Sequence, residues 1–190
     1  MAKDVVEGDG RLVVVLLRPG WQADYEASPP VFDIATLGRV SFHERHGDGR
    51  YNIVLEGVER VRLDEHDWRP GHKLYRLRGA RVANERRPPP GSTEERNAWR
   101  ALRQAWTGLI RVSAGDLDGI ELTNELGFEA FVNRLASEMP LPAATRQALL
   151  EENDLTERAG RLTSAVIERR ETLSMLRRFR SAAPADPGVN

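Results

Sequence analysis

Residues 37–63 restrict the fold of this chain more than any other part of the sequence. Two arms of alternating apolar and polar residues flank Gly47-Asp48-Gly49. Glycine and aspartate readily supply the positive φ of a tight turn. In the first arm Val40 and Phe42 alternate with polar residues, the period-2 pattern of a half-buried strand. The stretch therefore predicts a β-hairpin with Val40 and Phe42 on its buried face.

Further strands are predicted on both sides of this turn. In the second arm Tyr51, Ile53 and Leu55 share one face, and Gly57 then interrupts the alternation. Such an interruption indicates a β-bulge or a close backbone approach. Residues 11–18 hold a short continuous apolar run, whose length fits a strand buried on both faces. Residues 73–84 alternate weakly and predict one more strand.

The second half of the chain is predicted to be helical. Ser92 or Thr93 can cap a first helix, Thr123 a second, and Asp154 a last one. Pro140 and Pro142 end the second helix and start a short third one. The apolar residues of each long helix recur at intervals of three and four, which predicts one buried face per helix. These residues are Trp99, Leu102, Trp106 and Leu109; Phe128, Phe131, Leu135 and Met139; and Leu162, Val166, Leu173 and Leu176.

The predicted boundaries follow from composition. Pro88-Pro89-Pro90-Gly91 breaks regular structure, because consecutive prolines favour a stiff polyproline segment. We therefore expect a β part over residues 1–87 and a helical part over 92–180. Residues 181–190 are small and contain proline, which predicts a disordered tail. The fold class is α+β.

Three stretches resemble the N-terminal, substrate-binding domain of the ATP-dependent protease Lon, which also occurs as a stand-alone bacterial protein. The resemblance covers roughly residues 5–175. It implies a small PUA-like β-barrel followed by a helical bundle with one long last helix. The matching stretches are Gly38-Arg39-Val40 with Asp48 to Arg60, then Leu17-Arg18-Pro19-Gly20-Trp21, and finally Arg146 to Glu151 with Arg158 and Leu162.

The same resemblance carries an expectation about function. Family members recognise unfolded or tagged polypeptides and hand them to an ATPase and a protease, which would act here in trans. Members also begin with a proline-rich strand that we expect to have no counterpart in these 190 residues. Its absence would leave an unpaired sheet edge. A start codon further upstream is the favoured explanation. There are two alternatives. A segment of a neighbouring chain fills the place of the missing strand, or that place is itself the peptide-binding groove.

Catalytic motifs are missing from the sequence. It holds neither a P-loop nor a G-x-S-x-G elbow, and neither lysine matches the Lon serine–lysine site. Ser41 and His43 on one strand would be about 6.6 Å apart, beyond hydrogen-bond reach, which argues against a triad with Asp48. The four histidines lack metal-ligand spacing. We therefore expect no enzyme activity, no cofactor and no metal.

Four aromatic residues are the candidate peptide-binding residues: Trp21, Tyr25, Phe32 and Trp68. They lie in two polar loops, where isolated aromatics favour a recognition surface. The alternative is that they fold back over the sheet, because large aromatics are usually well buried.

Two other functional classes stay open. An RNA- or DNA-binding protein is the first, because PUA-like barrels often bind RNA and Arg60, Arg62 and Arg76 belong to an arginine-rich set. A formal net charge of −1 makes nucleic acid the less favoured partner. An enzyme without a recognisable motif is the second. A salt titration separates binding to nucleic acid from binding to apolar peptides, since only the former weakens steeply with salt.

Cysteine is absent, and the sequence has neither a signal peptide nor an apolar run long enough for a membrane span. We therefore expect a cytoplasmic protein that does not bind membranes. The sequence leaves its oligomeric state open.

Overall fold

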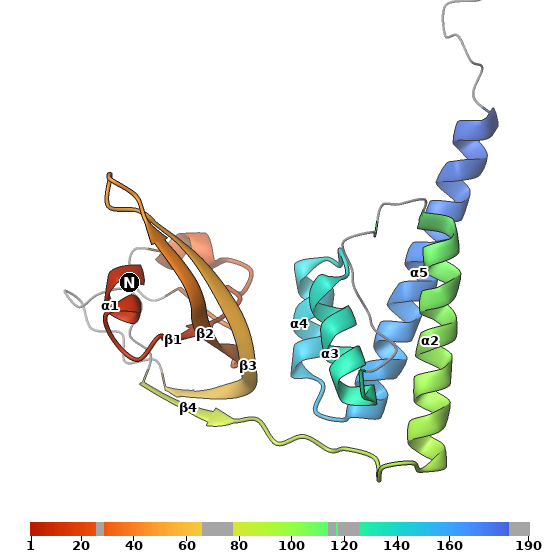
Figure 1. Cartoon of the computed structure of the whole chain (residues 1–190), viewed down its shortest axis with the longest axis horizontal. Helices are drawn as coiled ribbons and strands as arrows, with labels where there is room; N and C mark the ends of the chain where they lie inside the picture. The colour runs from red at the N-terminus through yellow and green to blue at the C-terminus, as the bar shows by residue number, and fades with distance from the viewer. Residues whose placement is uncertain (26–28, 66–77, 114–116, 118–125, 183–190) are drawn as a thin grey trace, which may run out of the picture. The chain divides into compact units, whose positions relative to one another are not determined.

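The structure is a computed structural model that describes residues 1–25, 29–65, 78–113, 117 and 126–182. The chain forms two compact units, Met1–Asn84 and Glu85–Asn190, each described below by itself. Glu85 to Arg87, expected in the β part, belong to the second unit. The first unit contains α1 (Ala2–Val6), β1 (Arg11–Val14), the 3-10 helix η1 (Trp21–Asp24), β2 (Ile34–Arg45), β3 (Tyr51–Glu65) and β4 (Arg78–Val82) (Figure 1).

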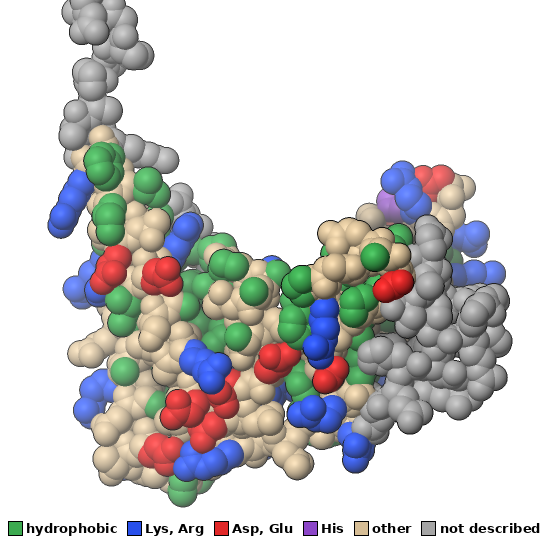
Figure 2. Space-filling model, turned by 180° about the vertical axis from the view of Figure 1, so that it is seen from behind, with side chains coloured by type: hydrophobic (Ala, Val, Ile, Leu, Met, Phe, Trp, Pro, Cys, Tyr) green, Lys and Arg blue, Asp and Glu red, His purple; other side chains and the backbone are tan. Residues whose placement is uncertain are grey.

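The described strands form one antiparallel sheet in the order β1-β2-β3-β4. The predicted hairpin is β2 and β3, and its turn is confirmed. The backbone N–H of His46 donates to the Arg50 carbonyl at 2.8 Å, and Gly49 has a φ of 86°. The Asp48 carboxylate accepts the Arg50 N–H at 3.0 Å. Figure 2 shows charged and histidine side chains gathered at the hairpin tip.

Two β-bulges interrupt this hairpin. Leu37 pairs with Glu59 but Gly38 pairs with Gly57, so Val58 is an extra residue and the bulge predicted at Gly57 is confirmed. Val40 pairs with Leu55 but Phe42 pairs with Val54, so Ser41 is extra on the other strand. An extra residue moves the following side chains to the opposite face. The prediction that Phe42 is buried is therefore wrong: its side chain is 59% exposed.

The core of the sheet unit is small. Ala35, Val61 and Leu63 are buried together, and Val13 and Leu37 pack against them. The prediction that the first strand is buried on both faces is wrong, because Val14 is 50% exposed. The reason is position: β1 pairs only with β2 and forms one edge of the described sheet.

The second unit contains α2 (Thr93–Ser113), α3 (Phe128–Glu138), α4 (Ala143–Glu151) and α5 (Leu155–Ala182) (Figure 1). Ser92 caps α2, because its Oγ accepts the Glu95 backbone N–H at 3.1 Å. Gly127 is the N-cap of α3, while Thr123 lies outside the described residues. Pro142 precedes α4 as predicted. α5 continues through Ala182, into the segment expected to be a tail.

The predicted inward faces of the helices form one large core. Leu102, Leu109, Leu135, Leu162 and Val166 are each 0% exposed within it. The exception is Leu176, which was predicted to be buried and is 48% exposed. It lies toward the end of α5, where Figure 2 shows hydrophobic side chains on the surface of the helical unit.

The reason for this exposure is the length of α2. Thr156 of α5 contacts Glu94 of α2, which lies 62 residues earlier in the chain. Arg170 of α5 lies beside Gly108 of α2, and these two residues are also 62 positions apart. α2 and α5 therefore run parallel and side by side (Figure 1). The end of α2 at Ser113 is level with Met175, and α5 continues beyond it. The α+β class, with an antiparallel sheet followed by helices and a long last helix, is confirmed.

Candidate functional site

The aromatic candidates of the sheet unit lie on a loop that leaves β1 and returns to β2. Leu17 and Val31 form an antiparallel bridge at its base. The Arg18 N–H donates to the Pro30 carbonyl at 2.7 Å, and the Phe32 N–H donates to the Leu16 carbonyl at 3.0 Å. These bonds close the loop, because they hold its two ends in a short ladder.

Arg18 is the side chain that fixes the base of this loop. Its Nε donates to the Val31 carbonyl at 2.7 Å, and its Nη2 lies 3.1 Å from Asp33 Oδ1. The guanidinium also lies over the Phe32 ring, 5.2 Å from the centroid, in cation–π geometry. Sequence reasoning assigned no role to Arg18. Its place immediately before Pro19-Gly20, at the start of a turn, is the signal that could have identified it.

Trp21 and Tyr25 form a pair within the loop. Gly20 is the N-cap of η1 and has a φ of 86°. Glycine adopts this left-handed conformation without strain, because it has no Cβ. The Trp21 N–H donates to the Arg18 carbonyl at 3.2 Å. The two rings meet edge to face with centroids 5.3 Å apart. The Tyr25 side chain is 56% exposed, while Trp21 is half-buried.

The structure thus brings three of the four candidates onto one loop. Trp21 contacts Tyr25, and half-buried Phe32 contacts Arg18. Trp68 lies outside the described residues. The loop is neither fully folded over the sheet nor fully exposed, because Trp21 and Phe32 are half-buried while Tyr25 is 56% exposed.

A second apolar surface lies on the hairpin and was missed by sequence reasoning. Phe42 and Val54 are cross-strand partners, 59% and 53% exposed, and share one face. Val58, at the other bulge, is 54% exposed. Only the bulge at Ser41 places Phe42 on this face, and no pattern in the sequence identified it. Exposed apolar side chains that lie together are a feature of interaction sites.

The outer edge of β1 is a third feature of this unit. The Val40 N–H donates to the Gly10 carbonyl at 2.8 Å, so alternation directs the backbone groups of Arg11 and Val13 away from β2. Asp9 Oδ1 accepts the Arg11 N–H at 3.0 Å. No other strand of the described residues pairs with this edge. Such an edge is able to accept an extended segment of another chain.

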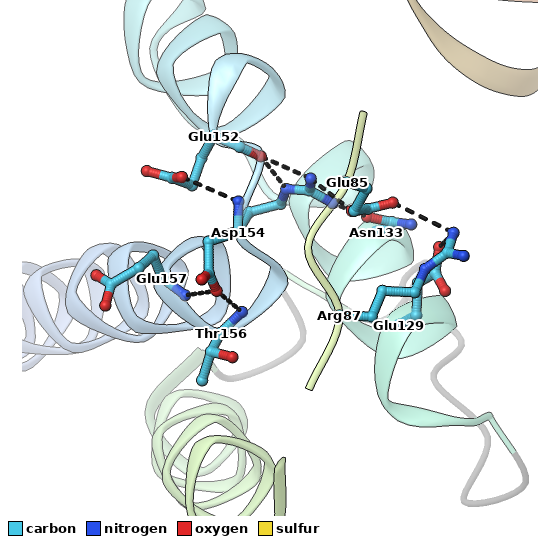
Figure 3. A network of polar contacts seen from close by, with 9 residues as sticks. Glu85, Arg87, Glu129, Asn133, Glu152, Asp154, Thr156 and Glu157 are labelled. Atoms are coloured by element: carbon cyan, nitrogen blue, oxygen red, sulfur yellow. Dashed lines mark hydrogen bonds and ion pairs between the residues drawn. The ribbon is translucent and has the colours of Figure 1, made fainter. Parts of the chain in front are cut away.

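A polar network of the helical unit includes Glu85, Asn133 and Glu152 (Figure 3). Arg158 contacts all three. The Arg158 side chain is 3% exposed. Its Nη2 lies 2.7 Å from Glu85 Oε1, and the two groups form an ion pair whose geometry does not meet that of a hydrogen bond. The guanidinium donates to the Glu152 carbonyl and, at 3.0 Å, to Asn133 Oδ1. Arg87 contacts Glu129 at 2.8 Å beside it. Because these groups come from α3, α5 and the end of α4 and carry opposite charges, the network holds the helices together.

Asp154 caps α5 next to this network. Its Oδ1 accepts the N–H groups of Thr156 at 2.8 Å and Glu157 at 3.2 Å, so the predicted cap is confirmed. The Asp154 N–H in turn donates to Glu152 Oε1 at 3.1 Å. Burial alone raises the pKa of Asp154, but the hydrogen bonds from Glu157, Arg86 and Thr156 outweigh it. The pKa therefore lies below its ordinary value.

This depressed pKa makes the helical unit sensitive to acid. A carboxylate with a lower pKa in the folded state stabilises above its unfolded pKa and loses that contribution as pH falls through the folded value. We expect Asp154→Asn to keep the cap, because asparagine is also a good N-cap residue. It should lose less stability than the unsubstituted protein as pH falls below the ordinary aspartate pKa of about 4. Urea unfolding followed by circular dichroism at each pH measures this. Equal losses in the two proteins would contradict the role given to Asp154.

Three further features of the described residues concern metal ligands, membrane helices and the Ser41–His43 pair. No three histidine, aspartate or glutamate side chains among them come together as metal ligands. Within the same part of the chain, no helix combines the length and the apolar character that a bilayer crossing requires. His43 is exposed on β2 and the Ser41 hydroxyl bonds the Val54 carbonyl at 3.3 Å, so these two residues do not meet as a catalytic pair.

Comparison with solved structures defines the class of domain. The N-terminal domain of Mycobacterium avium complex Lon protease is similar, with a TM-score of 0.51 and 14% identity over 84% of this chain and 90% of that one. The Lon N-terminal domain protein from Xanthomonas campestris gives a TM-score of 0.42 and 17% identity over 81% and 88%. The chain therefore has the α+β fold of Lon N-terminal domains, as the first of these likenesses shows.

The family itself follows from the sequence match. The sequence model of the family described as the ATP-dependent protease La (LON) substrate-binding domain matches residues 1–167. The chain belongs to this family and is a substrate-binding module. No match was found among curated proteins.

Proposed function

We propose that this protein binds unfolded or tagged polypeptides in the cytoplasm and delivers them to an ATPase and protease that act in trans. The observation that carries the proposal is the Trp21–Tyr25 pair, two rings in edge contact on a loop closed by Arg18. A fixed aromatic pair offers apolar area to a ligand at a low entropy cost. Membership of a substrate-binding family supports a polypeptide as that ligand.

Two other features of the sheet unit support the same proposal. Phe42 and Val54 add exposed apolar area on the hairpin. The outer edge of β1 offers backbone groups to an extended chain. Backbone pairing gives affinity for any sequence, while apolar contacts select unfolded segments, because folded proteins bury such side chains.

The proposal is tested by binding to a permanently unfolded protein, such as reduced and carboxymethylated lactalbumin, followed by fluorescence anisotropy. Trp21→Ala with Tyr25→Ala is expected to weaken binding about tenfold, the loss typical of a central aromatic pair. The melting temperature should be unchanged. Degradation of the same substrate by an ATP-dependent protease should be faster when this protein is added, and the double variant should lose that effect.

The matched control is Leu176→Ala, which also removes an exposed apolar side chain but lies on α5 of the helical unit. It should bind as the unsubstituted protein does. Equal binding by the aromatic variant would refute the loop as the site. A large fall in its melting temperature would instead assign Trp21 and Tyr25 to the core.

A further inference from the structure

A groove of about 1050 Å³ lies between α2 and α5 of the helical unit. Among the described residues, five arginines line it and no acidic residue does: Arg96, Arg100, Arg103 and Arg111 from α2, and Arg170 from α5. On α2 these arginines recur at near-helical spacing and form one stripe, about 22 Å long at 1.5 Å per residue. After Glu95 this helix has no acidic residue at all. The groove therefore concentrates positive charge along one line.

Three of these arginines have side chains without a charged or hydrogen-bonding partner in the described part of the chain. Within the described chain, the side chains of Arg100, Arg111 and Arg170 make neither an ion pair nor a hydrogen bond. Arg170 is half-buried and lies across α2, where a Cβ on Gly108 would be only 3.2 Å from its Nη1. Because Arg170 is half-buried against α2, it has less side-chain freedom to lose when a carboxylate binds.

The remaining lining favours a polypeptide over a nucleic acid. Ala101, Ala105 and Ile167 give the groove an aliphatic component. Single-stranded nucleic acids need open aromatic faces for base stacking. The Trp99 ring is not open, because Phe128 packs 6.1 Å from it and the Arg103 guanidinium lies 5.9 Å from its centroid. Arginines beside small apolar side chains instead complement a segment with both acidic and apolar residues.

We propose that the α2–α5 groove binds an acidic, amphipathic segment of a partner protein, separately from the aromatic loop. The carboxylates of the segment pair with Arg100, Arg111 and Arg170, and its apolar side chains contact Ile167. This site does not depend on the function proposed for the sheet unit.

The test uses the full chain and a fluorescein-labelled helical peptide of about 16 residues, built from glutamate and leucine and therefore about 24 Å long. The triple variant Arg100→Gln, Arg111→Gln, Arg170→Gln should lower its affinity at least tenfold. The matched control is Arg45→Gln, Arg62→Gln, Arg146→Gln, which removes the same charge from exposed positions outside the groove. It should change the affinity less than twofold.

Three results would overturn the proposal. The first is an equal loss in both triple variants, which would reduce the effect to net charge. The second is equal binding of a peptide with glutamine in place of glutamate. The third is a single-stranded oligonucleotide that binds more tightly than the peptide and loses its affinity in the groove variant, which would make nucleic acid the ligand. Unfolding curves of both variants confirm that each is folded, since all six positions carry partly or fully exposed side chains.

Discussion

Replacing Arg158 by methionine is expected to lower the free energy of unfolding of the helical unit by about 3–5 kcal/mol. Arg158 is 3% exposed and contacts Glu85, Asn133 and the Glu152 carbonyl. Its loss takes the buried partner from Glu85, which is itself 13% exposed, and leaves that carboxylate with the exposed Arg87 at 3.3 Å. A buried charge that loses its counter-charge costs far more than the pair contributes. Urea unfolding followed by circular dichroism at 222 nm measures the difference.

The matched control is Arg161→Met on the same helix. Arg161 also pairs with a carboxylate, Glu152 Oε2 at 2.7 Å, but its side chain is 57% exposed. Exposed pairs contribute about 0–1 kcal/mol, so this variant should remain close to the unsubstituted protein. Adding Glu85→Gln to Arg158→Met should recover part of the loss, because it removes the carboxylate that has lost its buried counter-charge. Equal effects of the two methionine substitutions would show that burial of Arg158 does not determine its contribution.

Truncating Leu162 to alanine should destabilise the helical unit by about 2–5 kcal/mol. Leu162 is 0% exposed in the core cluster, so its removal takes away buried methylene groups and leaves a cavity between packed helices. Leu176→Ala on the same helix deletes the same atoms from a side chain that is 48% exposed, and should cost less than about 0.5 kcal/mol. A comparable loss at both positions would mean that the end of α5 is covered in solution.

These expectations depend on contacts that the sequence predicts unevenly. The turn at Asp48-Gly49, the cap at Asp154 and the inward face of α3 follow from local rules, because one turn or one helix determines them. Phe42 was misplaced, because a bulge at Ser41 has no glycine to mark it. Leu176 was misplaced, because its burial depends on where another helix ends.

The candidate sites show the same division. Aromatic residues in polar loops could be identified from the sequence, and the structure joins Trp21 to Tyr25. The role of Arg18 depends on Val31 and Asp33, which reach it only when the loop closes. The pair of Arg158 and Glu85 joins positions far apart in the chain, and local pattern carries no information on such pairings.

The two bulges of the hairpin also bear on how sequences of this family can change length. Losing or gaining one residue in a regular strand turns every following side chain to the other face. Val58 and Ser41 are already supernumerary in their strands. An insertion or deletion at either position changes the bulge and can leave the pairing on both sides in place. Length variation between relatives is therefore expected to concentrate at these two points and at the turn, and alignments of this hairpin should place their gaps there.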